Sequence, residues 1–420
     1  MLKDSKFSSF LKTLGPGILF ASTAIGVSHL VQSTRAGAGY GFALVGFILA
    51  ANIFKYPFFE FGSRFANATG TSIIDGYKKI GRWMLWLYFL ITIGSMFFVS
   101  AAVGAVTSGF LQNLFGISEW GIWATVILFV ICSGILISGR YSALDSLIKV
   151  IGSVLLISTL VAFVLALMKG PSTQLPTFIA PDIWDNKTML FIIALMGWMP
   201  TAVDMSAWNS LWTIERIKQT GYKPTLKETL TDFNLGYIIS AVLSLCFVTL
   251  GAYMLYGTGA ELPNSSGAFA NSVIGLYTNF IGGWSYFIIA AAGFSIMFGT
   301  CIAVFDGYAR SLERSVELLF LPNDKNLDTR KVYNISLAVT AIGAFAIVFF
   351  FGAKLKSLVD LATTISFLIA PIIAIVNFKL VTGKLIPEDA KPKPWLRVLS
   401  WLGIVFLTGF AVYFLWVKLG

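Results

Sequence analysis

The chain has 420 residues, of which 57% are hydrophobic and only 12% carry a charge. Soluble proteins average about 25% charged residues, so this composition excludes a soluble domain and indicates a protein with many membrane-spanning helices. The formal net charge of +10 does not indicate a nucleic-acid partner, because the basic residues lie mainly in short connectors between apolar segments, as they do in membrane proteins.

Eleven segments are apolar and long enough to cross a bilayer, which takes about 20 residues in a helix. They are predicted at residues 13–38, 42–66, 83–113, 119–139, 142–168, 188–213, 230–256, 281–307, 332–352, 356–381 and 395–418. The cysteines Cys132, Cys246 and Cys301 each fall inside such a segment, and we interpret them as core residues.

Lysine and arginine are unevenly distributed between the two sets of connectors. Most of them, with Lys55 and Arg64 included, are assigned to the connectors on the side of the N-terminus. Because positively charged connectors stay in the cytoplasm, this bias predicts a cytoplasmic segment at 1–12 and a C-terminus outside. The expected location is a bacterial inner membrane. The longest outside segments, 170–187 and 257–282, are expected to be connectors or caps over the outer mouth.

Two of the predicted spans are interrupted by helix-breaking and polar residues. The first span breaks at Gly26–His29, and the sixth breaks at Gly197–Thr201, where Pro200 cannot donate a backbone hydrogen bond. Irregular backbone at membrane depth is tolerated where it is buried in protein or lines a cavity, so the breaks predict a substrate site. A packing kink is the alternative for either break alone, since glycine and proline are common in membrane helices.

The two breaks occupy the same position in two groups of five spans, at residues 13–168 and 188–381. Five is an odd number, so the second group enters the membrane from the opposite side to the first. The predicted fold is therefore an all-α membrane protein of the LeuT type, with a 5+5 inverted repeat and broken helices 1 and 6. The segment 395–418 is an additional eleventh helix.

His29 is the only histidine in the chain and lies at the first break. A neutral imidazole there binds a transition metal, carries a proton, or is bonded to a carbonyl of the unwound segment. Met199 offers a soft sulfur beside Pro200, which suits a transition metal, but a core methionine is the alternative.

Asp204 follows Thr201 by three residues and is expected on the same helical face. It is predicted to neutralise a cationic substrate, to pair with Arg35 or His29, or to interact with the dipole of the resumed helix. Asp360 and Thr363 form another polar face, or a solvated helix start, and Asp306 with Arg310 is expected to be a cytoplasmic pair or gate. The predicted substrate-binding residues are Gly26, Ser28, His29, Met199, Thr201, Asp204 and Thr363, with His29 and Met199 as metal ligands.

At these residues the chain resembles the Nramp family of divalent-metal transporters. The shared features are Gly15-Pro16-Gly17, the spacing to the first break, the Met199-Pro200 step and the number of spans. The resemblance implies a secondary transporter that moves an ion such as manganese or iron by alternating access.

The chain departs from the family pattern where the family binds its metal. The family reads Asp-Pro-Gly-Asn in the first span, where this chain reads Gly26, Val27, Ser28 and His29. The family reads Met-Pro-His in the sixth span, and the histidine is replaced by Thr201. A second family histidine falls at Ser206, a glutamine falls near Ala362, and the acids of span 3 and arginines of span 9 that are linked to proton transport are missing.

Three classes of function follow from this pattern. The first is an Nramp-related transporter of a divalent metal ion, which would be cargo rather than a cofactor. The second is a transporter of the same fold for a small organic solute, such as an amino acid or a small cation. The third is a receptor that does not transport. The sequence shows no nucleophile–base pair of the kind that an enzyme would need, so we do not expect an enzyme. The expected partners are the lipid bilayer and a small ion or solute.

Overall fold

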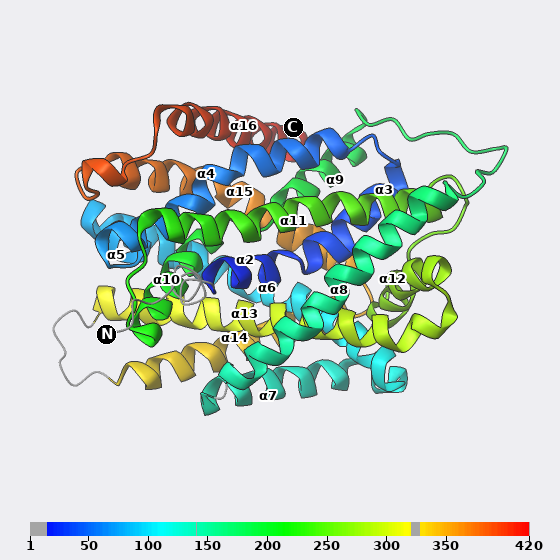
Figure 1. The fold of residues 1–420 in the computed structure, drawn as a ribbon, viewed down its shortest axis with the longest axis horizontal. Helices are drawn as coiled ribbons and strands as arrows, with labels where there is room; N and C mark the ends of the chain where they lie inside the picture. Colours follow the sequence, from blue (N-terminus) through cyan, green and yellow to red (C-terminus); the bar gives the residue numbers. More distant parts are fainter. Residues whose placement is uncertain (1–14, 140, 321–327, 420) are drawn as a thin grey trace, which may run out of the picture.

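The computed structural model describes residues 15–139, 141–320 and 328–419 (Figure 1). The predicted segment 1–12 lies outside the described residues. So do Arg140 and Lys325, two of the basic residues assigned to the connectors on the side of the N-terminus. No strand occurs in the described part of the chain. Its helices are α2 (Pro16–Ala24), α3 (Thr34–Tyr40), α4 (Val45–Thr69), α5 (Ile73–Ile80), α6 (Arg82–Phe115), α7 (Ile122–Ser138), α8 (Tyr141–Lys169), α9 (Asn186–Gly197), α10 (Ser206–Thr220), α11 (Leu226–Leu255), α12 (Ser266–Ile281), α13 (Tyr286–Phe320), α14 (Thr329–Phe351), α15 (Leu355–Thr382) and α16 (Pro394–Leu419).

Six of the described helices are long and apolar enough to cross a membrane: α6, α11, α13 with the turn before it, α14, α15 and α16. Shorter apolar helices include α7 and α9. Large apolar side chains on the outer helices are exposed, for example Phe350 at 82%, Val405 at 67% and Trp416 at 70%. Such a surface is unfavourable in water and is the surface that a helix presents to lipid.

Two predicted spans are each built from two helices rather than one. The first consists of α2, a wide π-helical turn η1 (Ser28–Ser33) and α3, and the sixth consists of α9, a short 3-10 turn η3 (Val203–Met205) and α10. The all-α fold with two broken helices is therefore confirmed. The sixth span breaks where the sequence predicts, whereas the first is already helical again at Ser28.

The start of the first broken helix explains the Gly15-Pro16-Gly17 motif. The amides of Gly15 and Gly17 donate to the two carboxylate oxygens of Asp232 in α11, at 3.3 and 2.7 Å. Pro16 lies between them and has no amide to satisfy, as is common at the first position of a helix. Asp232 therefore caps α2 from another helix. The start of α9 is capped locally by Asp185, whose pKa is held below its ordinary value because the Thr188 amide donates to the carboxylate.

The outside segment 257–282 was expected to be a connector or a cap over the outer mouth, and it contains the 16-residue helix α12. One part of the sequence prediction needs correction. Lys55 and Arg64 were assigned to a cytoplasmic connector, but both lie within α4 and are buried. Arg64 is paired there with Glu60, one turn earlier. These two buried residues are therefore not evidence for the orientation of the chain in the membrane, and that orientation stays a prediction.

Candidate functional site

The first break is a short interruption held by α13. Helix α2 ends at Ala24, and the amides of His29 and Leu30 return to the carbonyl of Gly26, at 3.2 and 3.0 Å. A β-carbon at Gly26 would come within 2.7 Å of the Thr300 methyl group of α13. The Thr300 hydroxyl donates to the carbonyl of Ser22 at 2.8 Å. The absence of a side chain at Gly26 therefore allows α13 to pack directly against the break.

The second break is longer and packs against α15. Helix α9 ends at Gly197, where a β-carbon would lie 2.0 Å from the carbonyl oxygen of Thr363. The indole of Trp198 donates to the hydroxyl of Ser366 at 2.8 Å. The hydroxyl of Thr201 donates to the sulfur of Met205 at 2.7 Å. Close packing at Gly197 and these polar contacts fix a non-helical path for residues 198–202.

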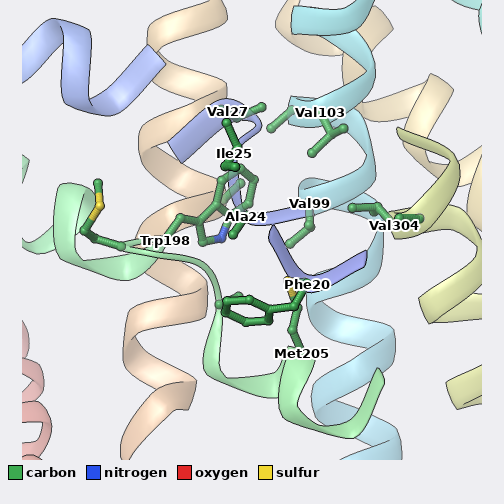
Figure 2. Packing of buried hydrophobic residues seen from close by; sticks show 14 of the residues in the cluster. Phe20, Ala24, Ile25, Val27, Val99, Val103, Trp198, Met205 and Val304 are labelled. Carbon is green, nitrogen blue, oxygen red and sulfur yellow. The ribbon is translucent and has the colours of Figure 1, made fainter. Parts of the chain in front are cut away.

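A small cavity of about 20 Å³ lies between the two breaks, α6 and α13. Figure 2 shows several of the side chains around it, from Val27 and Trp198 to Val99, Val103 and Val304. Its volume is of the order of a single water molecule. Its lining residues are Thr23, Val27, Ser28, Val99, Val103, Trp198, Thr201, Ala202, Met205, Trp208, Thr300, Val304 and Tyr308. The lining is apolar and hydroxyl-bearing, and none of these residues has a carboxylate.

Only two of the predicted substrate-binding residues, Ser28 and Thr201, line this cavity. Gly26 provides space for Thr300, and Thr363 contacts Gln32 beside Asp360. Met199 is fully buried but is not among the lining residues. Met205, six residues further along, supplies the sulfur of the cavity instead. No group of three or more His, Cys, Asp or Glu side chains suited to a metal occurs in the described residues.

His29 is fully buried and its ring is bonded on both sides. Its Nδ1 lies 2.7 Å from the hydroxyl of Ser28, and its Nε2 lies 2.8 Å from the carbonyl oxygen of Ser240 in α11. A carbonyl oxygen accepts only, so Nε2 carries the proton in this contact. This is the carbonyl-bonded alternative among the three considered for His29, although the acceptor lies in α11 and not in the unwound segment. Its role as a metal ligand stays a prediction.

Asp204 is buried in η3, and its Oδ1 has no hydrogen-bond partner among the described residues. The two partners predicted for it are engaged elsewhere. His29 bonds Ser28 and Ser240, and Arg35 forms two bonds with Asp360, at 2.6 and 2.9 Å. The 3-10 turn also removes the helical-face relation with Thr201. Asp204 therefore remains a buried carboxylate beside the second break.

Lys55 is the residue of the site that sequence reasoning missed. Its ammonium donates to the carbonyl oxygens of Met196, Gly197 and Thr201, at 2.9, 3.0 and 2.7 Å. The side chain is fully buried. A signal was present, because a charged residue in the middle of the predicted span 42–66 is expected to have a specific role. The charge count assigned it to a connector instead.

Two larger cavities flank the central one, and among the described residues the three share no lining residue. The N-side pocket, of about 590 Å³, contains Gly15 and Arg310. The C-side pocket, of about 560 Å³, contains Arg35 and Lys418. The central cavity is therefore distinct from the pockets toward the two ends of the molecule.

The two broken helices run in opposite directions between these pockets. Helix α2 starts at the N-side pocket, which also contains Trp212 of α10, and α9 starts near the C-side pocket, which also contains Tyr40 of α3. Each pocket thus holds the start of one broken helix and the far half of the other. This antiparallel arrangement is the one that an inverted repeat requires.

An ion-pair network lies at each pocket. At the C-side pocket, Gln32 donates to Asp360 at 3.0 Å and accepts from Arg35 at 2.8 Å, so it joins the pair between α3 and α15. At the N-side pocket, the Arg310 guanidinium donates to Asp306 at 2.9 Å, and Tyr333 donates to the same carboxylate at 2.8 Å. The predicted pair of Asp306 and Arg310 is therefore present, and it reaches α14 through Tyr333.

Comparison with known proteins places this architecture in a family. The family described as "Natural resistance-associated macrophage protein-like" (Nramp) matches residues 17–417. An uncharacterised protein of Pasteurella multocida is 34% identical over 416 residues, which cover 99% of this chain and 94% of that protein. The divalent metal cation transporter MntH of Levilactobacillus brevis is 22% identical over 443 residues and covers 100% of this chain and 92% of that protein.

Solved structures share the fold at low sequence identity. The manganese transporter of Eremococcus coleocola superimposes with a TM-score of 0.73 at 14% identity, over 98% of this chain and 88% of that one. MhsT in complex with L-phenylalanine superimposes with a TM-score of 0.60 at 13% identity, over 97% of this chain and 98% of that one. With its LeuT-type broken helices and a family match over nearly its whole length, the chain belongs to the Nramp family of membrane proteins.

Proposed function

We propose that this protein is a secondary transporter that works by alternating access, with its substrate site between the two helix breaks. The observation that carries the proposal is the central cavity at the breaks, with a separate pocket toward each end of the molecule. Opening toward one pocket at a time would expose Ser28 and Thr201 to one side and then to the other.

The family indicates a divalent metal ion as the first substrate class, since relatives at 22% identity are named as divalent metal cation transporters. In this chain the side-chain donors at the cavity would be the sulfur of Met205 and the hydroxyls of Ser28, Thr201 and Thr300. Sulfur favours a transition metal over magnesium. A divalent ion bound here without a carboxylate would have to keep part of its water shell.

A small polar organic solute is the second candidate, and the charges of the C-side pocket favour it. The C-side pocket carries the cationic side chains of Arg35, Lys187, Lys356 and Lys418 against the carboxylates of Glu261 and Asp360. A net positive mouth repels a divalent cation and accepts a neutral or anionic solute. Hydroxyls and the Trp198 ring suit a neutral polar molecule, for which the cavity of about 20 Å³ would have to widen on opening.

Uptake into proteoliposomes tests the proposal and separates the two classes. Manganese, iron, cobalt and magnesium are tested in one series, and amino acids and small amines in another, each against empty vesicles. Thr201→Val removes a cavity hydroxyl, and Thr107→Val, at a buried threonine of α6 outside the cavity, is the control. We expect one series to show uptake that Thr201→Val lowers and Thr107→Val keeps.

Accumulation of a metal assigns the first class, and accumulation of an organic solute with no metal uptake assigns the second. If no compound in either series exceeds the empty vesicles, with the protein folded and inserted, the transporter proposal fails.

A further inference from the structure

The ammonium of Lys55 is completely coordinated by the second break. An ammonium group has three donors and no acceptor. Its three contacts, to the carbonyl oxygens of Met196, Gly197 and Thr201, all fall between 2.7 and 3.0 Å. The group is fully buried, so water does not share this coordination. Each N–H therefore has one carbonyl partner, and the three partners belong to the last turn of α9 and to the unwound segment that follows it.

These carbonyls belong to the part of a broken helix that attracts cations. Met196 and Gly197 form the last turn of α9, where the helix dipole is negative, and the Met196 carbonyl also accepts from the Met199 amide at 3.3 Å. The Thr201 carbonyl belongs to the unwound segment that follows. In transporters with broken helices, carbonyls of this kind hold the coupling cation. In this chain the side chain of α4 already holds a positive charge at that place.

The surroundings of Lys55 are those of a bound cation. Asp204 of η3, in the same break, is also buried. The ring of Phe59, one turn along α4, lies with its centroid 6.0 Å from Nζ. A buried ammonium is costly unless its donors are satisfied, and here three carbonyl oxygens accept from it.

We propose that Lys55 is a tethered cation, which takes the place of a dissociable monovalent cation at the end of α9. The break is then held in its non-helical path without an ion from solution, and free cations are excluded from this position by charge and by space. The inference rests on the proposed transport function only for one consequence, namely that uptake does not depend on a sodium or potassium gradient.

Thermal unfolding of the purified full chain in detergent tests the tethered cation without any transport assay. The wild-type protein is compared in lithium, sodium, potassium and choline chloride at equal ionic strength. We expect the same unfolding midpoint in all four salts. Lys55→Met is similar in length but neutral, and we expect its midpoint to fall in choline and to rise saturably with one of the small cations, as binding to the folded state requires.

Lys79→Met is the matched control, because Lys79 is an exposed lysine in α5. We expect it to behave like the wild type in every salt. If Lys55→Met does not fold, Lys55→Ala is prepared with propylammonium chloride, which supplies the missing ammonium. We expect recovery of folded protein with propylammonium and not with tetramethylammonium, which has no N–H donor.

Three results would each overturn the inference. The first is a saturable, cation-specific stabilisation of the wild type. The second is a Lys55→Met protein that folds and responds identically to all four salts, and the third is a Lys55→Ala protein that propylammonium does not recover. None of these results depends on substrate, so the inference and the transporter proposal can fail separately.

Discussion

At the scale of single residues, substitution of His29 distinguishes a role in packing from a role in metal binding. Its ring joins η1 to α11 through the Ser240 carbonyl and is fully buried. His29→Ala removes these contacts and leaves a void, so we expect the free energy of unfolding to fall by roughly 2–4 kcal/mol. His29→Gln keeps a polar group and is expected to recover part of this loss. The measurement is the unfolding midpoint in detergent, without added metal.

The same variants test the metal-ligand hypothesis for His29. Manganese is added to the wild type and to both variants, and the shift in midpoint is recorded. A structural histidine predicts equal shifts, or none, in all three proteins. A shift that the wild type shows and both variants lack, combined with unchanged stability in the absence of metal, would contradict the structural role and support ligation.

At the scale of elements, the contact between α2 and α11 depends on two glycines. A β-carbon at Gly17 would lie 2.0 Å from the carbonyl oxygen of Asp232, and one at Gly236 would lie 2.0 Å from the carbonyl oxygen of Gly17. Backbone on both sides leaves no flexible group to move aside. Gly17→Ala and Gly236→Ala are therefore expected to separate the helices and to destabilise the protein by about 3 kcal/mol each, as overpacking does.

Gly94 in α6 is the matched control for these substitutions, because nothing lies within 4 Å of a β-carbon built there. Gly94→Ala is expected to be neutral or to stabilise its helix by up to about 1 kcal/mol, since alanine is the better helix former. Unfolding midpoints of the three variants, measured side by side, check the prediction. A Gly17→Ala protein as stable as Gly94→Ala would show that α2 and α11 do not pack as described.

At the scale of the whole molecule, the pair of Arg35 and Asp360 lies at the C-side pocket, and we expect it to act as the gate between that pocket and the central cavity. It joins α3, the far half of the first broken helix, to α15. Asp360→Ala removes this link and favours the form open toward the C-side pocket. A shift of about 1.4 kcal/mol in that equilibrium would raise access to the cavity about tenfold.

The measurement is the labelling rate of Thr201→Cys by a thiol reagent that does not cross membranes. The three native cysteines are buried, so the background labelling is expected to be low. The matched control is Asp306→Asn, which weakens the network at the opposite pocket. We expect labelling from the C-side to rise with Asp360→Ala and not with Asp306→Asn, and equal rates in the two proteins would contradict a gate at Asp360.

The sequence by itself determined the class of the molecule. Apolar runs and helix breakers are local properties of a chain, so they predict the spans, the two broken helices and the repeat without knowledge of any contact. The Gly15-Pro16-Gly17 and Met199-Pro200 features were enough to indicate the family, which the match over residues 17–417 confirms. The candidate site was predicted only in part, since Ser28 and Thr201 line the cavity and His29 does not.

Only the tertiary structure decided which groups meet at the site. The bond from Lys55 to Gly197 joins residues 142 positions apart, that from His29 to Ser240 joins residues 211 apart, and the pair of Arg35 and Asp360 joins residues 325 apart. The hydropathy of the sequence indicates how deep in the membrane a residue lies but not which neighbour its side chain faces. A polar side chain in a membrane protein forms its hydrogen bonds with whichever carbonyl or carboxylate the packing brings to it. The position of Lys55 within an apolar span was readable from the sequence, and its three carbonyl partners were not.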